Sequence, residues 1–157
     1  IMEGTRPLLA EGQALVTKTT FNVPRRTANG FDYNRAVLLL AVLEKRGGLH
    51  LGTFDGYINV VGGLSLDEPA ADLPVALAVA SSYRDKPVAQ DLAAVGEIGL
   101  AGEVRAVSHL SLRLGEIARL GFTRCIIPRS GTEAMEAPNG LELIRVRNVR
   151  EAIEFAL

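Results

Sequence analysis

The chain has 157 residues, of which 48% are hydrophobic and 22% are charged, and its formal net charge is −1. This length suits one domain that buries most of its apolar surface, and the composition excludes a disordered chain. Cys125 is the single cysteine, which excludes an internal disulfide and fits a reducing cytoplasm. No run approaches the roughly 20 apolar residues that a membrane helix needs, and no secretory leader is recognisable. We therefore expect a globular cytoplasmic protein with no membrane contact.

The N-terminal third is expected to form a strand, a loop and a helix. Partial alternation predicts a strand over residues 8–20, and the proline, asparagine and glycine residues of 22–30 predict a loop. Asp32 is placed to cap a helix whose run 36–43 is apolar almost all round, which is typical of a helix packed on more than one side. The pair Gly47-Gly48 predicts the end of this helix.

The middle of the chain is expected to add a strand, a second helix and a hairpin. Residues 57–61 indicate a short strand. Pro69 then opens an apolar helix through residues 75–80, since proline is tolerated in the first helical turn. Strands over 94–98 and 103–107 flank a glycine-rich turn, which is a hairpin pattern.

In the C-terminal part, predicted helices again alternate with predicted strands. Helical spacing of apolar residues predicts a helix over 110–120, and apolar runs predict strands over 125–128 and 141–146. A last helix is expected over 149–157. Since no linker or repeat divides the chain, the prediction is one mixed α/β (α+β) domain over residues 1–157.

Four segments carry a resemblance to a known family. They are 3–16, 24–35 (PRRTANGFDYNR), 68–73 (EPAADL) and 96–105 (GEIGLAGEVR). In this order they resemble the C-terminal domain of the RadA/Sms family of bacterial DNA repair proteins, which is similar to the proteolytic domain of Lon. The resemblance implies a Lon-protease-like fold cut from a longer chain. A zinc finger and a RecA-like ATPase would lie upstream, so ATP, magnesium and zinc are expected only there and no cofactor is expected in this domain.

The same resemblance points to a degenerate active site. Lon-type peptidases use a serine nucleophile and a lysine that accepts its proton. Ala70 stands at the position of the serine and Ser111 at that of the lysine. The three lysines of the chain are expected at the ends of elements, so none has the context of a buried, low-pKa amine. We therefore expect no peptidase activity and no catalytic residue.

The remaining candidates for chemistry are given structural roles. Ser81 and Ser82 are expected at the end of an apolar helix, where hydroxyl groups usually bond to the helix backbone. His109 is expected to cap a helix or lie on the surface, His50 to be solvated, and Cys125 to be a small core residue. Two histidines and one cysteine at scattered positions predict no metal site, and no phosphate-binding loop of the GxxxxGK[ST] kind is present.

The expected function is therefore assembly and DNA contact. Lon peptidase domains form six-membered rings, so the resemblance implies a homo-hexamer, a DNA-dependent ATPase in the full-length protein, and a role in recombination by branch migration, with the recombinase RecA as a candidate partner. A sequence-independent grip on DNA needs several cations along one surface. The residues chosen for this role are Lys18, Arg25, Arg26, Arg84, Lys86 and Arg124.

Other interpretations stay open. These cations could be solvated surface charges or could pair with glutamates. The domain could be a hydrolase with a rearranged active site that uses Ser81 or Ser111. It could also be a purely structural module that docks other proteins and does not contact DNA, since a balanced chain can still carry a polarised face.

Overall fold

The computed structural model describes residues 2–3, 6–7, 11–20, 23–61 and 69–157. It is a mixed α/β domain built on two three-stranded sheets. The first sheet has the order β3-β5-β4, with strands Glu11–Lys18, Phe54–Val61 and Arg26–Asn29, and the second has the order β10-β9-β6, with strands Glu142–Val146, Arg124–Pro128 and Leu92–Ala94. The helices are α1 (Tyr33–Arg46), α2 (Asp72–Arg84), α3 (Leu110–Arg119) and α4 (Val149–Ala156). Short elements complete the chain: β1 (Met2–Glu3), β2 (Arg6–Pro7), the 3-10 helix η1 (Pro69–Ala71), β7 (Glu97–Ile98) and β8 (Val104–Arg105).

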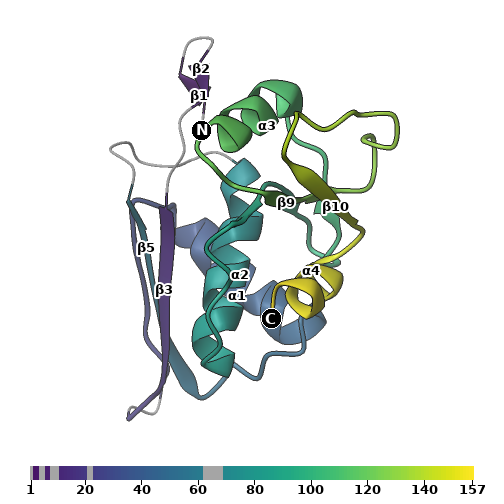
Figure 1. Cartoon of the computed structure of the whole chain (residues 1–157). Coiled ribbons are helices and arrows are strands. Elements are labelled where there is room, and N and C mark those ends of the chain that lie inside the picture. The colour runs from purple at the N-terminus through teal and green to yellow at the C-terminus, as the bar shows by residue number, and fades with distance from the viewer. Residues whose placement is uncertain (1, 4–5, 8–10, 21–22, 62–68) are drawn as a thin grey trace.

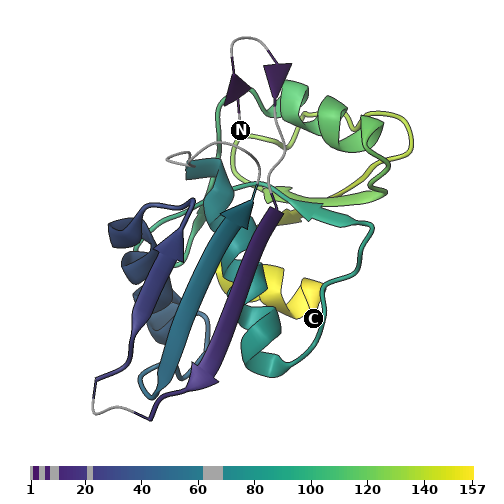
Figure 2. The ribbon, with the colours of Figure 1, turned by 90° about the vertical axis from the view of Figure 1, so that its left-hand side faces the viewer.

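Helix α2 lies between the two sheets, and α1 lies beside it against the first sheet (Figure 1). In this sheet β5 is central, antiparallel to β3 and parallel to β4. Figure 2 shows the three strands side by side with the helices behind them. Asp32 caps α1 by accepting a hydrogen bond from the Arg35 backbone N–H at 2.9 Å, which satisfies a donor that the helix cannot satisfy itself. The main core therefore forms between the first sheet and the helices α1, α2 and α4.

Both faces of β9 in the second sheet are apolar, and each face packs against a different part of the core. Ile126 packs into the main core, whereas Cys125 and Ile127 pack with Leu114 and Ile117 of α3. Side chains of a strand alternate between faces, so a central parallel strand between helices reads as a continuous apolar run. The three strands of this sheet are all parallel.

Most predicted elements are confirmed. The four helices, the strands β9 and β10, and the hairpin turn between β7 and β8 lie where the sequence places them. Strand β5 is longer than the predicted 57–61. Of the predicted strand over 8–20, residues 8–10 lie outside the described residues, and the rest contains β3.

Two predictions are wrong. The expected loop over 22–30 contains the strand β4, which pairs with β5 from Arg26↔Gly56 to Asn29↔Asn59. Its side chains alternate between half-buried and exposed, but Ala28 is its only apolar residue, so the hydrophobic signal of a strand is weak. The expected strand over 94–98 is divided: Ala94 belongs to β6 and pairs with β9, and only Glu97–Ile98 forms the hairpin.

In the part of the chain that the structure describes, no helix combines the length and the hydropathy that crossing a bilayer requires.

Candidate functional site

The position matched to the Lon-type serine lies in a second apolar cluster, which we call the second core, and the position matched to the lysine lies next to it in the chain. The buried residues of the second core are Ala70, Val95, Leu110, Leu114, Ile117, Cys125, Ile127 and Leu141. Ala70 is buried in η1 and belongs to the same apolar cluster as Leu110, the first residue of α3. Ser111 follows Leu110 and is exposed. The 3-10 helix before α2 and the start of α3 thus contribute to the same apolar cluster. At the first of these positions the side chain is a methyl group, which carries no nucleophilic atom, and at the second it is a hydroxyl rather than an amine.

The N-terminus of α2 is occupied by groups of the chain itself. The Leu73 backbone N–H donates to the carbonyl of Gly96 at 3.0 Å. The carboxylate of Asp72 accepts a hydrogen bond from the Ile98 backbone N–H at 3.0 Å and from Arg35 Nε at 2.6 Å. A helix N-terminus can hold an anion through its free amides. Here a carboxylate of the same chain already lies beside this end of the helix.

The ion pair between Arg35 and Asp72 joins α1 to α2. The Asp72 side chain is 2% exposed and that of Arg35 is 27% exposed, with Glu97 at 3.8 Å from the same guanidinium. Burial raises the pKa of Asp72, while hydrogen bonds from Arg35 and from the Ile98 backbone oppose that rise. A buried carboxylate of this kind depends on its partner for charge compensation. Sequence reasoning did not find this pair, because its members are 37 residues apart and lie on different helices.

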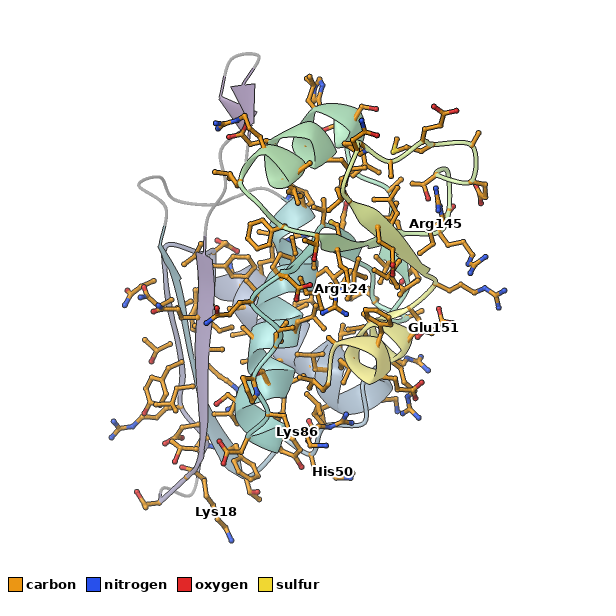
Figure 3. All side chains as sticks on the ribbon, viewed as in Figure 1. Lys18, His50, Lys86, Arg124, Arg145 and Glu151 are labelled. Atoms are coloured by element: carbon orange, nitrogen blue, oxygen red, sulfur yellow. The ribbon has the colours of Figure 1, made fainter. Side chains whose placement is uncertain are left out.

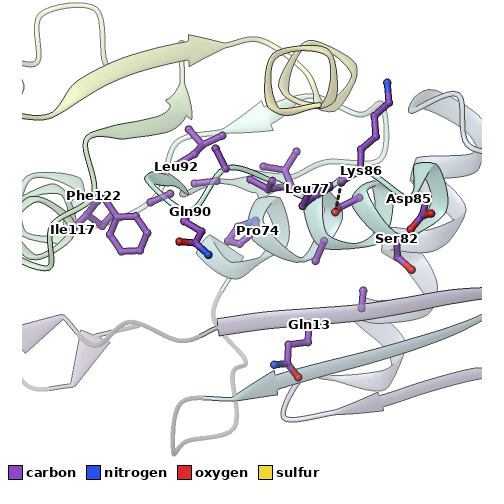
Figure 4. A pocket seen from close by; sticks show the side chains of 18 of the residues that line it. Gln13, Pro74, Leu77, Ser82, Asp85, Lys86, Gln90, Leu92, Ile117 and Phe122 are labelled. Atoms are coloured by element: carbon purple, nitrogen blue, oxygen red, sulfur yellow. Dashed lines mark hydrogen bonds between the residues drawn. The ribbon is translucent and has the colours of Figure 1, made fainter.

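A groove of about 1170 Å³ runs along α2 (Figure 4). Gln13 and Ala14 of β3 line one side and residues 86–90 and 92–94 line the other, with Ile117 and Phe122 at one end. The Ser82 hydroxyl accepts a hydrogen bond from the Val16 backbone N–H at 2.9 Å, and the Ser81 hydroxyl donates to the Lys86 carbonyl at 2.5 Å. Both hydroxyls therefore bond to backbone groups, but these groups lie outside α2, in β3 and in the segment after the helix, and not in the helix backbone that was expected.

The histidines and the cysteine have no shared site. His109 lies directly before α3 with a left-handed backbone (φ 56°), and its side chain makes no capping hydrogen bond. His50 is exposed. Cys125 is fully buried, and burial raises the pKa of its thiol to about 12, so the reactive thiolate is not formed at neutral pH. Among the described residues, no three His, Cys, Asp or Glu side chains lie close enough to hold a metal ion.

Four of the six cations chosen for DNA contact are exposed and gather at one end of the first sheet. Lys18 pairs with Phe54 in the sheet register, and the Phe54 ring contacts Tyr83 of α2 at a centroid distance of 5.4 Å. This contact brings the end of α2 beside Lys18, and Figure 3 shows Lys18 and Lys86 at the same end of the molecule. We call the following residues the basic end: Lys18, Arg25, Arg84 and Lys86.

The other two chosen arginines are engaged within the fold. The Arg26 guanidinium donates to the carbonyls of Leu51, at 3.1 Å, and of Phe54. Arg124 forms two hydrogen bonds with Asp91, at 3.1 and 3.0 Å, and its guanidinium carbon lies 5.8 Å from the centroid of the Phe155 ring. The structure therefore gives Arg26 and Arg124 structural partners, which the sequence alone did not indicate.

The Arg124 pair yields a prediction about pH. Hydrogen bonds from Arg124 and Thr123 lower the pKa of Asp91 to about 2. A lowered carboxyl pKa contributes stability above its unfolded value, and this contribution is lost as the pH falls through the folded value. Replacing Arg124 by glutamine should raise the Asp91 pKa toward its ordinary value, so the stability difference from wild type should be present at neutral pH and vanish in strong acid.

An NMR titration of the Asp91 carboxyl carbon would measure this shift. Arg119→Gln is a matched control, because Arg119 pairs with Glu116 on α3 and should leave Asp91 unchanged. An Asp91 pKa that stays near 2 in Arg124→Gln would show that Arg124 is not what lowers it.

Comparison with known proteins shows which family and which relatives the chain resembles. The family of Lon protease (S16) C-terminal proteolytic domains matches residues 53–157. The chain is 51% identical over 156 residues to the DNA repair protein RadA of Bacillus subtilis, covering 99% of this chain and 34% of the relative. It is 49% identical over 153 residues to RadA of Streptococcus pneumoniae, covering 98% and 36%, and 50% identical over 156 residues to RadA of Halalkalibacterium halodurans, covering 99% and 34%.

The chain thus spans about a third of the length of these curated relatives. The resemblance to the Lon-like domain of RadA proteins, expected from four sequence segments, is confirmed along nearly the whole chain. The family match covers one strand of the first sheet, all three strands of the second and three of the four helices, so this chain belongs to the Lon protease (S16) C-terminal proteolytic domain family.

Proposed function

We propose that the chain is a non-catalytic Lon-like domain of a RadA-type DNA repair protein, which assembles a ring and adds a DNA-binding surface. The observation that carries this proposal is the buried methyl group of Ala70 at the start of α2, in a chain that otherwise keeps the Lon-like fold. A fold that has lost its catalytic nucleophile can still serve another function, because one fold can carry different functional sites. In the full-length protein, an upstream zinc finger and RecA-like ATPase would supply the zinc, ATP and magnesium chemistry for branch migration in the cytoplasm, with RecA as a partner.

An apolar strip on α1 supports the assembly half of the proposal. Tyr33, Val37 and Leu38 on α1 are 52%, 37% and 47% exposed, and Leu100 in the neighbouring hairpin turn is 67% exposed. Leu38 and Leu100 line the same small cavity beside Arg35. Contiguous exposed apolar groups often mark protein contacts, and a ring needs a head-to-tail interface that closes on itself. The α1 strip is a fitting surface for one side of that interface.

The basic end supports the DNA half. Its exposed lysines and arginines can neutralise phosphates, which gives sequence-independent and salt-dependent binding. Six copies in a ring would multiply a weak patch through avidity. Arg26 is better left intact in tests, since its guanidinium holds the backbone of residues 51–54.

A hydrolase with a rearranged site is the second candidate. Serine at positions 81, 82 and 111 is what favours it, but the hydroxyls of Ser81 and Ser82 are bonded to backbone groups. This alternative requires that the wild-type chain hydrolyses casein and that Ser81→Ala or Ser111→Ala abolishes the hydrolysis. A structural docking module, the third candidate, would form the ring but ignore DNA.

The test measures mass and DNA binding on one sample. Light scattering should give a mass near six chains of 16.8 kDa, and Leu38→Glu should reduce it to one chain, because a charge in an apolar interface is costly. Anisotropy of labelled single-stranded DNA should show binding that weakens with salt and falls in Lys18→Ala/Arg25→Ala.

Two results would contradict the proposal. A wild-type chain that stays monomeric at high concentration would overturn the ring. A ring that does not bind DNA at low salt would overturn the DNA half and leave the docking module.

A further inference from the structure

We propose that a second basic surface, away from the cations that the sequence singled out, binds the phosphate backbone of the DNA. This inference rests on the proposed function and names the surface that carries it. The surface is formed by five exposed arginines from separate segments, and we call it the arginine face: Arg46, Arg105, Arg129, Arg147 and Arg150.

Parallel strand pairing brings Arg129 and Arg147 together. Each follows the last residue of its strand, and those last residues, Pro128 of β9 and Val146 of β10, are register partners. The Arg129 backbone N–H donates to the Val146 carbonyl at 2.9 Å. Both arginines therefore leave the sheet at the carboxyl ends of adjacent parallel strands, the edge at which open α/β sheets commonly bind ligands.

The hairpin adds Arg105 to the same edge. The Val104 backbone N–H donates to the Arg147 carbonyl at 2.9 Å, and Glu103 forms an antiparallel bridge with Asn148. Arg105 is the residue after Val104, and its side chain is 55% exposed. The last residue of β8 thus lies beside the start of α4.

The ends of α1 and α4 complete the face. A side chain at Gly102 would meet the Arg46 Cβ at 2.8 Å, and the Val149 N–H donates to the Gly102 carbonyl at 2.8 Å. The Arg150 guanidinium lies 3.3 Å from where a Cβ of Gly48 would be. Arg46 and Arg150 therefore flank the contact between the hairpin turn and the two helices.

Carboxylates compensate this surface only in part. Glu103 pairs with Arg105 at 3.2 Å, and Glu151 accepts a hydrogen bond from the Arg147 backbone N–H at 2.6 Å. Glu154 follows Arg150 by one helical turn. Within the described ranges, no ion pair involves the side chains of the other four arginines: Arg46, Arg129, Arg147 and Arg150.

These features favour a surface that binds a polyanion over one whose arginines are merely solvated. The chain as a whole has a net charge of −1, so the gathering of arginines at one edge is local. Arginine binds phosphate with two parallel hydrogen bonds, and several such cations along one surface give a grip that does not depend on base sequence. By contrast, Arg124 is paired with the carboxylate of Asp91 and Arg26 with two backbone carbonyls, which shows what a structural role looks like in this fold.

The experiment compares charge reversals in the 157-residue chain by anisotropy of a labelled 30-nucleotide single strand over a range of salt. Arg147→Glu/Arg150→Glu should weaken binding at least tenfold and make the salt slope shallower by about 1.4, since each lost phosphate contact to a single strand changes it by roughly 0.7. Arg119→Glu, a reversal on α3 outside both basic surfaces, should bind like wild type. Lys18→Glu/Lys86→Glu reports on the basic end. Circular dichroism melts check that each variant is folded.

The outcomes separate this inference from the proposed function. Loss of binding in Arg147→Glu/Arg150→Glu, with or without loss at the basic end, supports the arginine face. Loss only in Lys18→Glu/Lys86→Glu overturns the arginine face and keeps the DNA half of the proposed function. A wild-type chain that does not bind DNA even at low salt overturns both.

Discussion

Replacing Arg35 by methionine is expected to lower the free energy of unfolding by about 3 kcal/mol at pH 7, the usual loss when one member of a buried ion pair is removed. The variant leaves the carboxylate of Asp72, which is 2% exposed, with the Ile98 backbone N–H at 3.0 Å as its remaining donor among the residues that the structure describes. A urea titration followed by circular dichroism would measure the change.

The pH dependence of this loss identifies its cause. Burial already raises the pKa of Asp72 in the folded chain, and Arg35 opposes that rise. A raised carboxyl pKa gives stability that is complete below the unfolded value and is lost as the pH rises through the folded value. Without Arg35 the folded pKa should rise further. The variant should therefore be least stable, relative to wild type, at neutral pH, and should approach wild type as Asp72 is protonated toward pH 4.

A double variant is the matched control. Arg35→Met/Asp72→Asn removes the charge as well as its partner, so it should recover part of the stability that Arg35→Met loses. A loss that does not change with pH, or that the double variant shares in full, would show that the packing of the arginine side chain rather than the buried charge is responsible.

Replacing Gly30 by alanine should also be costly. Gly30 has a φ of 70°, and a Cβ there would lie 2.3 Å from the carbonyl oxygen of Val60 in β5. An L-residue in the left-handed region costs about 1–2 kcal/mol, and relief of an overpacked contact costs about 1–3 kcal/mol more. We expect a total loss of about 3 kcal/mol in thermal or urea unfolding, because the backbone must move where β4 meets β5.

Gly140→Ala separates the two contributions. Gly140 also has a left-handed backbone, with φ 83°, but apart from its chain neighbours no atom of the described residues lies within 4 Å of the position of its Cβ. It should lose only the backbone cost. Equal losses in the two variants would mean that the contact with Val60 relaxes freely and that the position of Gly30 does not fix the register of β4.

The fold could be predicted from sequence wherever local signals agree with packing. Asp32 and the pair Gly47-Gly48 bound α1 because side-chain capping and the left-handed backbone of Gly48 are local effects. Strand β4 was missed because Pro24 and Gly30 beside it signal a loop, and its pairing with β5 is a long-range contact. Strand β6 was missed for a similar reason, since three residues carry too little pattern to predict a partner 32 positions away.

The candidate site divides in the same way. The resemblance and the preceding Pro69 both predicted that Ala70 lies at the start of a helix. The structure confirms this, since Ala70 lies in η1 directly before α2. Which cations are exposed could not be predicted, because it depends on whether a carboxylate or a carbonyl from a distant segment lies within reach. Arg124 pairs with Asp91 of an adjacent segment, and Arg26 donates to the carbonyls of Leu51 and Phe54, before and at the start of β5. The arginine face is likewise a product of strand register and not of any sequence motif.

The thiol of Cys125 can report on the opening of the second core. It is the only thiol of the chain, it is fully buried between β9 and α3, and its pKa of about 12 keeps it protonated. A thiol reagent in solution can therefore modify it only when the layer that contains Ala70 and the start of α3 opens. The labelling rate of this one native residue measures how often that layer opens, without any engineered probe.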